Sequence, residues 1–330
     1  MNFSNSSVIG MNCERKSDME SFMLAAEVVV PLIVYMATGG LIRKLNIMSR
    51  DNFRAVNVLV FRVFLPLTLF FNVYDVDLES AVRPDVFALV LVGILAVFAA
   101  AWLVTDRWVE NRADGSSVIQ GIYRSNFVLF GSSIALSLCD AKGQALLSAL
   151  AALAVPMFNV LAVILFETRR GGGMKPRSIV LNILKNPLVD AGILGCIFNL
   201  SGLRLPELLE EPLVSMAGIA TPLALVTLGG LLSFGSIVSH RKYLTVAVLA
   251  RLVFVPFVML TAFALAGYRG DALVAVLAVF GSPTAVASAP MAQAMGGNGS
   301  LAGEIVAVTS VCCIVTIFLF VYVLSFTGLI

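Results

Sequence analysis

The sequence predicts an all-α polytopic membrane protein, with ten transmembrane helices that form two inverted five-helix repeats and with broken fourth and ninth helices. Hydrophobic residues make up 59% of the 330 residues and charged residues only 13%, whereas soluble domains average roughly half and a quarter. A spanning helix needs about 20 mostly apolar residues, and the chain contains ten such runs. The two halves also share motifs at similar spacings, which predicts a structural repeat.

The ten apolar runs are bounded by charged or turn-forming residues. They fall at 22–42, 55–73, 86–106, 118–138, 144–167, 180–201, 212–234, 244–266, 272–294 and 302–328. Residues 1–20 are expected to form an extracytoplasmic polar tail. They lack the basic stretch and apolar core of a signal peptide, so insertion is expected to depend on an uncleaved first helix. The first repeat is expected at 21–168, a cytoplasmic linker at 169–179 and the second repeat at 180–330.

Basic residues in the loops set the expected orientation. If the chain crosses the membrane at every run, thirteen of the 22 lysines and arginines lie in loops on one side and four lie in loops on the other. Because cytoplasmic loops carry the excess of Lys and Arg, both termini are expected outside the cytoplasm. The net charge of +2 then reflects topology, and nucleic acid is not an expected partner.

Proline-leucine pairs mark the internal repeat. Pro31-Leu32 and Pro66-Leu67 are 35 residues apart, and Pro187-Leu188 and Pro222-Leu223 have the same separation after a shift of 156. The stretch FGSS at 130–133 is matched by FGSP at 280–283 after a shift of 150. Five spans per half is an odd number, so the second half is expected to enter the membrane from the opposite face.

The ninth span is expected to break. Pro283 lacks an N–H and clashes with the preceding turn, which Gly281 and Ser282 loosen. Pro290 predicts a second interruption. Since a break in lipid survives only beside protein or water, this span is expected to be central.

The fourth span carries the matching motif without the proline. A break is expected at Gly131, Ser132 and Ser133, whose hydroxyls can bond to nearby carbonyls. The alternative is that these small residues only allow close packing between helices.

The two breaks are expected to form an anion site. Each second half-helix presents the partly positive end of its dipole to the break, and Gly131–Ser133 together with Ser282, Pro283 and Thr284 are expected to contact the substrate. The amide of Asn126 is expected to hydrogen-bond the substrate; an interhelical tie is the alternative. Arg124 is expected to clamp a second carboxylate; extension to the cytoplasmic interface is the alternative.

Other charges within the spans need an explanation, because charge inside a membrane is costly. Asp190 and Arg251 each lie in the cytoplasmic half of a span and are expected to form a structural pair. Glu27 and Glu304 fall near the ends of the first and tenth spans, where an interfacial position is expected.

The residue inventory argues against an enzyme, a metal site and a cofactor. His240 is the single histidine, and the five cysteines contain no CxxC pair. Neither a GxSxG elbow nor an HExxH motif is present.

Five stretches resemble the auxin efflux carrier family. They are VFRVFLPLTLFFNV, YRSNFVLFGSSIAL, KNPLVDAGILGCIFNLSGLRLP, TPLALVTLGGLL and FGSPTAVASAPMAQAMGG, in the second, fourth, sixth, seventh and ninth spans. The resemblance implies that the fourth and ninth spans cross at their breaks within a transport domain, and that the first, second, sixth and seventh spans form the scaffold. Asn126 matches the family's fourth-span asparagine and Pro283 its ninth-span crossing proline, whereas Ser133 stands near the position of its fourth-span proline.

The motif RSN at 124–126 and the short central loop resemble the bacterial malate and malonate permeases more than the plant carriers. The expected function is therefore elevator-like secondary transport of small organic carboxylate anions across a lipid bilayer, in a bacterial cytoplasmic membrane. The alternatives are a sodium-coupled symporter of the bile-acid type and a receptor that keeps the fold without transport. Coupling to protons or sodium, and assembly as a homodimer, stay open.

Overall fold

The computed structural model describes residues 29–74, 83–169, 181 and 185–330. The expected tail at 1–20, Glu27 and nearly all of the expected linker at 169–179 lie outside these residues. Within them the fold is all-helical, as the composition predicts, and its only β pairing is an isolated bridge.

Six of the described helices are long and apolar enough to cross a membrane. They are α2–η1–α3 (Arg50–Tyr74), α4 (Pro84–Thr105), α7 (Ala141–Arg169), α10 (Glu207–Leu231), α12–η2–α13 (Arg241–Leu265) and α16 (Gly299–Phe326). Two of them contain a five-residue π-helical segment, which is η1 (Val60–Phe64) in the first and η2 (Ala250–Phe254) in the second. Such segments are local departures from the α-helical ladder that are frequent at functional sites.

The remaining described helices are shorter. They are the helix at 29–44, α5 (Arg112–Tyr123), α6 (Phe127–Leu138), α9 (Pro187–Ser201), α11 (Phe234–Ser239), α14 (Asp271–Gly281) and α15 (Ser288–Met295). The runs expected at 118–138 and 272–294 therefore each form two helices, with an interruption inside the run.

Local sequence signals fix many of these helix ends. Asn111, Asn186 and Asn298 precede α5, α9 and α16, and each side-chain oxygen accepts a first-turn N–H, at 2.8, 3.0 and 3.0 Å respectively. Asparagine is among the best N-cap residues for this reason. At the other end, α9 and α15 stop at Gly202 and Gly296, whose positive φ of 68° and 85° suits a left-handed C-cap.

The helix at 29–44 crosses α10 at a backbone-to-backbone contact. A Cβ atom on Gly39 would lie 1.8 Å from the carbonyl oxygen of Val226, and one on Gly229 would lie 1.9 Å from that of Met36. Only glycine allows two helices to approach so closely. A related contact joins α9 to α3, where a Cβ on Gly195 would lie 2.8 Å from the carbonyl oxygen of Phe70.

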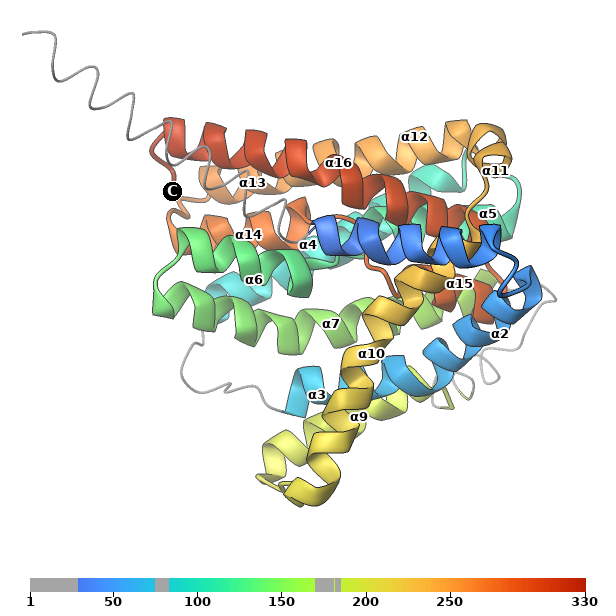
Figure 1. Cartoon of the computed structure of the whole chain (residues 1–330). Helices are drawn as coiled ribbons and strands as arrows, with labels where there is room; N and C mark the ends of the chain where they lie inside the picture. Colours follow the sequence, from blue (N-terminus) through green and yellow to red (C-terminus); the bar gives the residue numbers. More distant parts are fainter. Residues whose placement is uncertain (1–28, 75–82, 170–180, 182–184) are drawn as a thin grey trace, which may run out of the picture.

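One end of the molecule gathers the basic loops. In Figure 1 it is the right-hand end, where α2, α5, α12 and α16 begin and α4 ends. We call it the basic end. Arg43 donates there to the carbonyl oxygens of Gly230 and Leu232 at the end of α10, at 3.0 and 3.3 Å, and Arg169 pairs with Asp106.

The interrupted helices lie in the middle of the fold. Every residue of α14 from Ala272 to Gly281 is buried, and so is every residue of α5 from Gly115 to Tyr123. The long spans α4 and α10 instead expose many apolar side chains, as expected of helices that face lipid. The expectation that the fourth and ninth runs are central is therefore confirmed.

Candidate functional site

The two interruptions cross each other. The chain leaves α5 at Tyr123 and enters α6 at Phe127, and it leaves α14 at Gly281 and enters α15 at Ser288. Ser125 and Thr284 form an antiparallel bridge at the crossing. Two backbone hydrogen bonds flank it, from Asn126 N to Pro283 O at 2.9 Å and from Ala285 N to Arg124 O at 3.2 Å. Each interrupted segment therefore satisfies backbone groups of the other, as buried backbone requires.

The first interruption is not at the position that the repeat motif predicts. Gly131, Ser132 and Ser133 lie inside α6, and the interruption comes earlier, at 124–126. A Cβ on Gly131 would lie 3.1 Å from the Cβ of Ala278 on α14. The expected break at Gly131–Ser133 is thus wrong at this position, and Gly131 instead allows α6 to pack closely against α14.

The second interruption spans 282–287 and contains Pro283. Gly281 is the last residue of α14. Pro290 does not interrupt the helix again, because it is the third residue of α15. A backbone N–H in the first turn has no partner within the helix, so a proline there costs little. The second interruption expected at Pro290 is therefore wrong.

Polar atoms of the second interruption are used inside the crossing. Ser282 Oγ donates to Ala278 O at 2.6 Å, and Thr284 Oγ1 donates to Gly121 O at 2.7 Å. Thr284 N donates to Thr309 Oγ1 at 3.2 Å. Ser282, Pro283 and Thr284 thus hold the crossing together, and none of them lines the cavity beside it.

Arg251 binds the ends of both interrupted helices. Its side chain is completely buried, and it donates to Ser282 O at 2.8 Å and Val279 O at 3.0 Å at the end of α14. It also donates to Ile122 O at 3.2 Å and Tyr123 O at 3.4 Å at the end of α5.

These carbonyls correct the pairing expected for Arg251. The donors of its guanidinium bind backbone oxygens that the helix breaks leave free. Asp190 is exposed in the first turn of α9, and the two side chains form no ion pair. The expected Asp190–Arg251 pair is therefore wrong.

A cavity of about 160 Å³ opens beside the crossing. Arg124, Ser125 and Asn126 line it from the first interruption, and residues 285–287 line it from the second. Its other walls come from α3, α6, α7, α9 and α10. Polar side chains on these walls are Thr68, Asn72, Asn159 and Thr221.

These four wall residues were not among the predicted site residues. Each is a polar residue inside an apolar run, which is a signal that the sequence carries. The signal is weak, because polar side chains within membranes also serve as ties between helices. Asn126 and Arg124 are the two predicted residues whose side chains lie at the cavity.

Three polar side-chain atoms of the described residues close to the crossing have no partner, and two of them belong to the cavity-lining residues Ser125 and Asn126. Asn126 Nδ2, Ser125 Oγ and Ser288 Oγ are buried and have no hydrogen-bond partner within the described chain. A buried donor without a partner costs about 1–3 kcal/mol. A ligand in the cavity that accepts a hydrogen bond from Asn126 would recover that free energy.

Arg124 is held in place by neighbouring side chains. It is 4% exposed, and it donates from Nη2 to Asn159 Oδ1 at 2.5 Å and from Nη1 to Met291 Sδ at 3.0 Å. The Gln120 amide, oriented by its neighbours, accepts from Arg124 Nη1 at 3.1 Å. The cation is therefore fixed at the wall of the cavity and does not extend to an interface.

The electrostatics of the crossing favour an anion. α6 and α15 both begin at the crossing, so their partly positive N-terminal ends meet there. The partly negative ends of α5 and α14 are covered by the Arg251 cation. Among the described residues that line the cavity, Arg124 is the one charged side chain, and no group of three His, Cys, Asp or Glu residues suited to a metal ion occurs in the described part of the chain.

Comparisons with known proteins agree with a transport role. A family model described as "Membrane transport protein" matches residues 24–321. An uncharacterized transporter of Methanothermobacter thermautotrophicus is 24% identical over 217 residues, which cover 64% of this chain and 70% of that protein. Because the family match spans most of the sequence, the chain belongs to the membrane transport protein family, in agreement with its resemblance to the auxin efflux carriers.

Proposed function

We propose that this membrane transport protein is a secondary carrier of small organic carboxylate anions, with its binding site in the cavity at the crossing. The observation that carries the proposal is the buried, unpartnered amide nitrogen of Asn126 beside the fixed guanidinium of Arg124. A hydrogen-bond donor and a cation on one wall suit a carboxylate. Malate and malonate are the substrates that the resemblance of the RSN motif to the bacterial permeases implies.

The proposed architecture is a ten-helix inverted repeat. The helix at 29–44 contacts α10 through Gly39, and α9 contacts α3 through Gly195. In the proposed order of spans, the first helix of each repeat thus packs on the second helix of the other repeat. This reciprocal packing supports two related halves, at 21–168 and 180–330.

The proposed mechanism is elevator-like alternating access. The cavity lies at an interface that we call the seam. On one side of the seam are α2–α3 and α10, and on the other side are the crossing, α7 and α15. We propose that α2–α3, α9, α10 and the helix at 29–44 form the scaffold. The crossing would move along it and carry the anion from one face to the other, with the basic end in the cytoplasm and both termini outside.

Flux measurements on reconstituted protein test this function. Proteoliposomes containing the full chain are loaded with buffer, and uptake of radiolabelled malonate, acetate and choline is followed with and without sodium and pH gradients. The proposal predicts uptake of the carboxylates above that of protein-free vesicles and no uptake of choline.

The rival functions give different results in the same assay. A bile-acid-type symporter would require an inward sodium gradient for uptake. A receptor without transport would bind malonate in a thermal-shift titration but would show no flux. Choline uptake that equals malonate uptake would contradict an anion carrier.

A further inference from the structure

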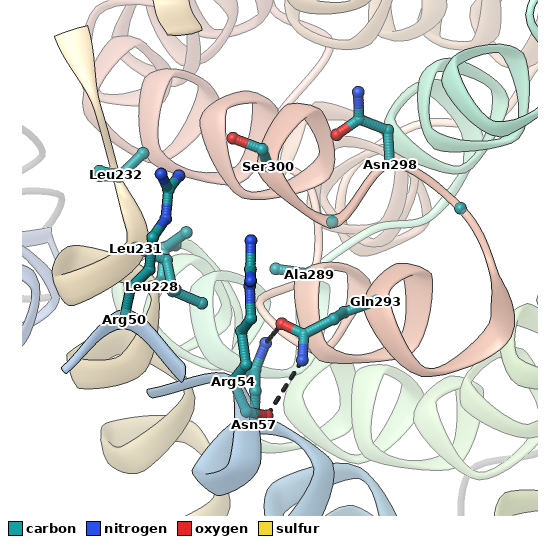
Figure 2. A pocket seen from close by; sticks show the side chains of 12 residues that line it. Arg50, Arg54, Asn57, Leu228, Leu231, Leu232, Ala289, Gln293, Asn298 and Ser300 are labelled. Atoms are coloured by element: carbon teal, nitrogen blue, oxygen red, sulfur yellow. Dashed lines mark hydrogen bonds between the residues drawn. The ribbon is translucent and has the colours of Figure 1, made fainter. Parts of the chain in front are cut away.

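A second polar cavity lies in the same seam, at the basic end. Its volume is about 250 Å³. It lies between the start of α2, the end of α10, α15 and the first turn of α16. Figure 2 shows Arg50 and Arg54 extending from α2 into this space, with Gln293 and Ser300 across from them.

Among the described residues that line this cavity, the charged side chains are both cationic, and they are Arg50 and Arg54. Arg50 and Arg54 are one helical turn apart on α2, where like charges are unfavourable. Arg54 Nη1 lies 3.1 Å from Asp51 Oδ1, but that carboxylate is 86% exposed and does not line the cavity. The side chain of Arg50 forms no hydrogen bond or ion pair within the part of the chain that the structure describes. An anion between the two guanidinium groups would relieve their repulsion.

The neutral polar groups of the walls are already paired. Asn57 Nδ2 donates to Gln293 Oε1 at 2.9 Å, and Gln293 Nε2 donates to Arg54 O at 3.0 Å. Thr227 Oγ1 donates to Asn57 Oδ1 at 2.9 Å. These bonds join α2, α10 and α15 across the seam. On α2, the side chains that can still bind a ligand are therefore those of the two arginines.

Two carboxylates of the described residues lie next to the opposite wall, and both are paired. Asn298 Nδ2 donates to Asp114 Oδ1 at 2.7 Å, and Glu304 has partners on both of its oxygens. Ser300 Oγ donates to Glu304 Oε1 at 3.1 Å, and His240 Nδ1 lies 2.9 Å from Glu304 Oε2. Ser236 Oγ donates to Glu304 Oε1 at 2.5 Å. The Glu304 side chain is completely buried behind these groups, so it does not offer a free negative charge to the cavity.

The first turn of α16 adds a partly positive wall. α16 is 28 residues long and begins at Gly299. A Cβ on Gly299 would lie 2.9 Å from the Cβ of Gln293, so this turn packs directly against α15. The aligned peptide dipoles of a long helix carry about half a positive charge at this end, which adds to the field of Arg50 and Arg54.

The two cavities follow α10 and the segment that leads into α15. Leu228 and Ala289 line the second cavity, and Ala224 and Ala285, four residues earlier in each case, line the crossing cavity. We propose that the second cavity binds a small carboxylate anion between Arg50 and Arg54, as a vestibule between the solution at the basic end and the crossing. Anion binding in this vestibule stands on its own, whereas its place on a transport route rests on the proposed function.

The test is a malonate titration of the purified full chain in detergent, at constant ionic strength, read as the increase in melting temperature. All variants carry Asn126→Ala, so that malonate binding in the crossing cavity contributes less to the increase in melting temperature. The double variant Arg50→Gln/Arg54→Gln is compared with Arg107→Gln. Arg107 is another exposed arginine of the basic end that donates to Leu103 O at 2.6 Å and lies outside the cavity.

We expect the double variant to raise the half-saturating malonate concentration about tenfold or more, and Arg107→Gln to leave it within about twofold. An unchanged value in the double variant would overturn the proposal. An equal rise in both variants would also overturn it, because it would reveal only a general effect of surface charge. Absence of any malonate-induced stabilisation in the Asn126→Ala parent would likewise count against the site.

The transport role of the vestibule is read separately. In proteoliposomes that take up malonate, the double variant is expected to raise the half-saturating malonate concentration about tenfold when malonate is supplied on the side of the basic end. When malonate is supplied on the other side, the half-saturating concentration is expected to stay unchanged. Equal changes at both ends would contradict a vestibule. If the wild-type protein shows no flux, the proposed function fails, while the titration still decides whether the anion binds.

Discussion

Arg251 Nε lies 2.8 Å from the carbonyl oxygen of Ser282, inside the crossing and out of contact with water. The same guanidinium reaches the end of α5 through the carbonyl oxygens of Ile122 and Tyr123. One side chain from η2 therefore holds the ends of two interrupted helices together. It also covers their partly negative ends with a cation, which leaves the crossing attractive to anions.

Arg251→Met is expected to destabilise the protein strongly. The substitution keeps an apolar stem but leaves four buried carbonyl oxygens without this donor, and hydrogen bonds to a charged group contribute about 1.5–3 kcal/mol each. Thermal unfolding of the detergent-solubilised protein measures the effect, and we expect a loss of about 3 kcal/mol or more. Arg251→Lys, which keeps the charge with fewer donors, is expected to be intermediate.

Arg62→Met is the matched control for Arg251. Arg62 also lies in a π-helical segment, η1, but its side chain is exposed and forms no hydrogen bond within the described residues. We expect little change in melting temperature, since surface substitutions are usually within about 0.5 kcal/mol. Equal destabilisation by the two substitutions would contradict the role assigned to Arg251.

Two glycines of α10 are expected to respond in opposite ways to alanine. A Cβ on Gly229 would lie 1.9 Å from the carbonyl oxygen of Met36, whereas one on Gly218 would meet no atom within 4 Å. Gly229→Ala should force the helix at 29–44 away from α10 and cost about 1–3 kcal/mol. Gly218→Ala should leave stability unchanged or raise it by up to about 1 kcal/mol. Thermal unfolding of the two variants checks the pair, and a reversed order would contradict the packing.

The sequence predicts the second interruption well, because its cause is local. Proline has no N–H to donate, so Pro283 disrupts the helix wherever the fold places it. The first interruption has no proline, and its position depends on contacts that the sequence does not reveal. The backbone of Arg124 to Asn126 is held open by bonds to Pro283 and Ala285 from the other half of the chain.

The choice of repeat shift also explains the misplaced first interruption. The shift of 150 aligns Pro283 with Ser133, inside α6, whereas the shift of 156 given by the proline-leucine pairs aligns it with Phe127, where α6 begins. The similarity of FGSS and FGSP therefore does not mark equivalent breaks. Gly131 instead marks the contact between α6 and α14.

Charge partners were the least predictable feature. Position along the spans predicts that Arg251 pairs with Asp190, because a carboxylate is the partner of an arginine that a sequence displays. The actual partners are carbonyl oxygens that become free only when two helices end. Asn126, by contrast, stands out in the sequence as a polar residue in a central span, and its unpartnered amide lies at the cavity.

Arg124→Gln is expected to discriminate between substrates. Arg124 is fixed at the cavity wall by Asn159 and Met291, where its guanidinium can bind a second carboxylate group in two-point fashion. Malonate uptake should fall about tenfold or more, and acetate uptake should fall by a much smaller factor. Equal losses for the two anions would eliminate the proposed clamp.

The central claim, that the cavity at the crossing binds the transported anion, is tested most directly by malonate uptake into proteoliposomes containing Asn126→Ala. Because Asn126 Nδ2 has no partner in the described chain, its loss should leave the melting temperature of the ligand-free protein nearly unchanged. Initial uptake should fall about tenfold or more, while Asn52→Ala, an exposed asparagine on α2, should transport like the wild type. Wild-type uptake by Asn126→Ala, or a loss matched by Asn52→Ala, would contradict the claim.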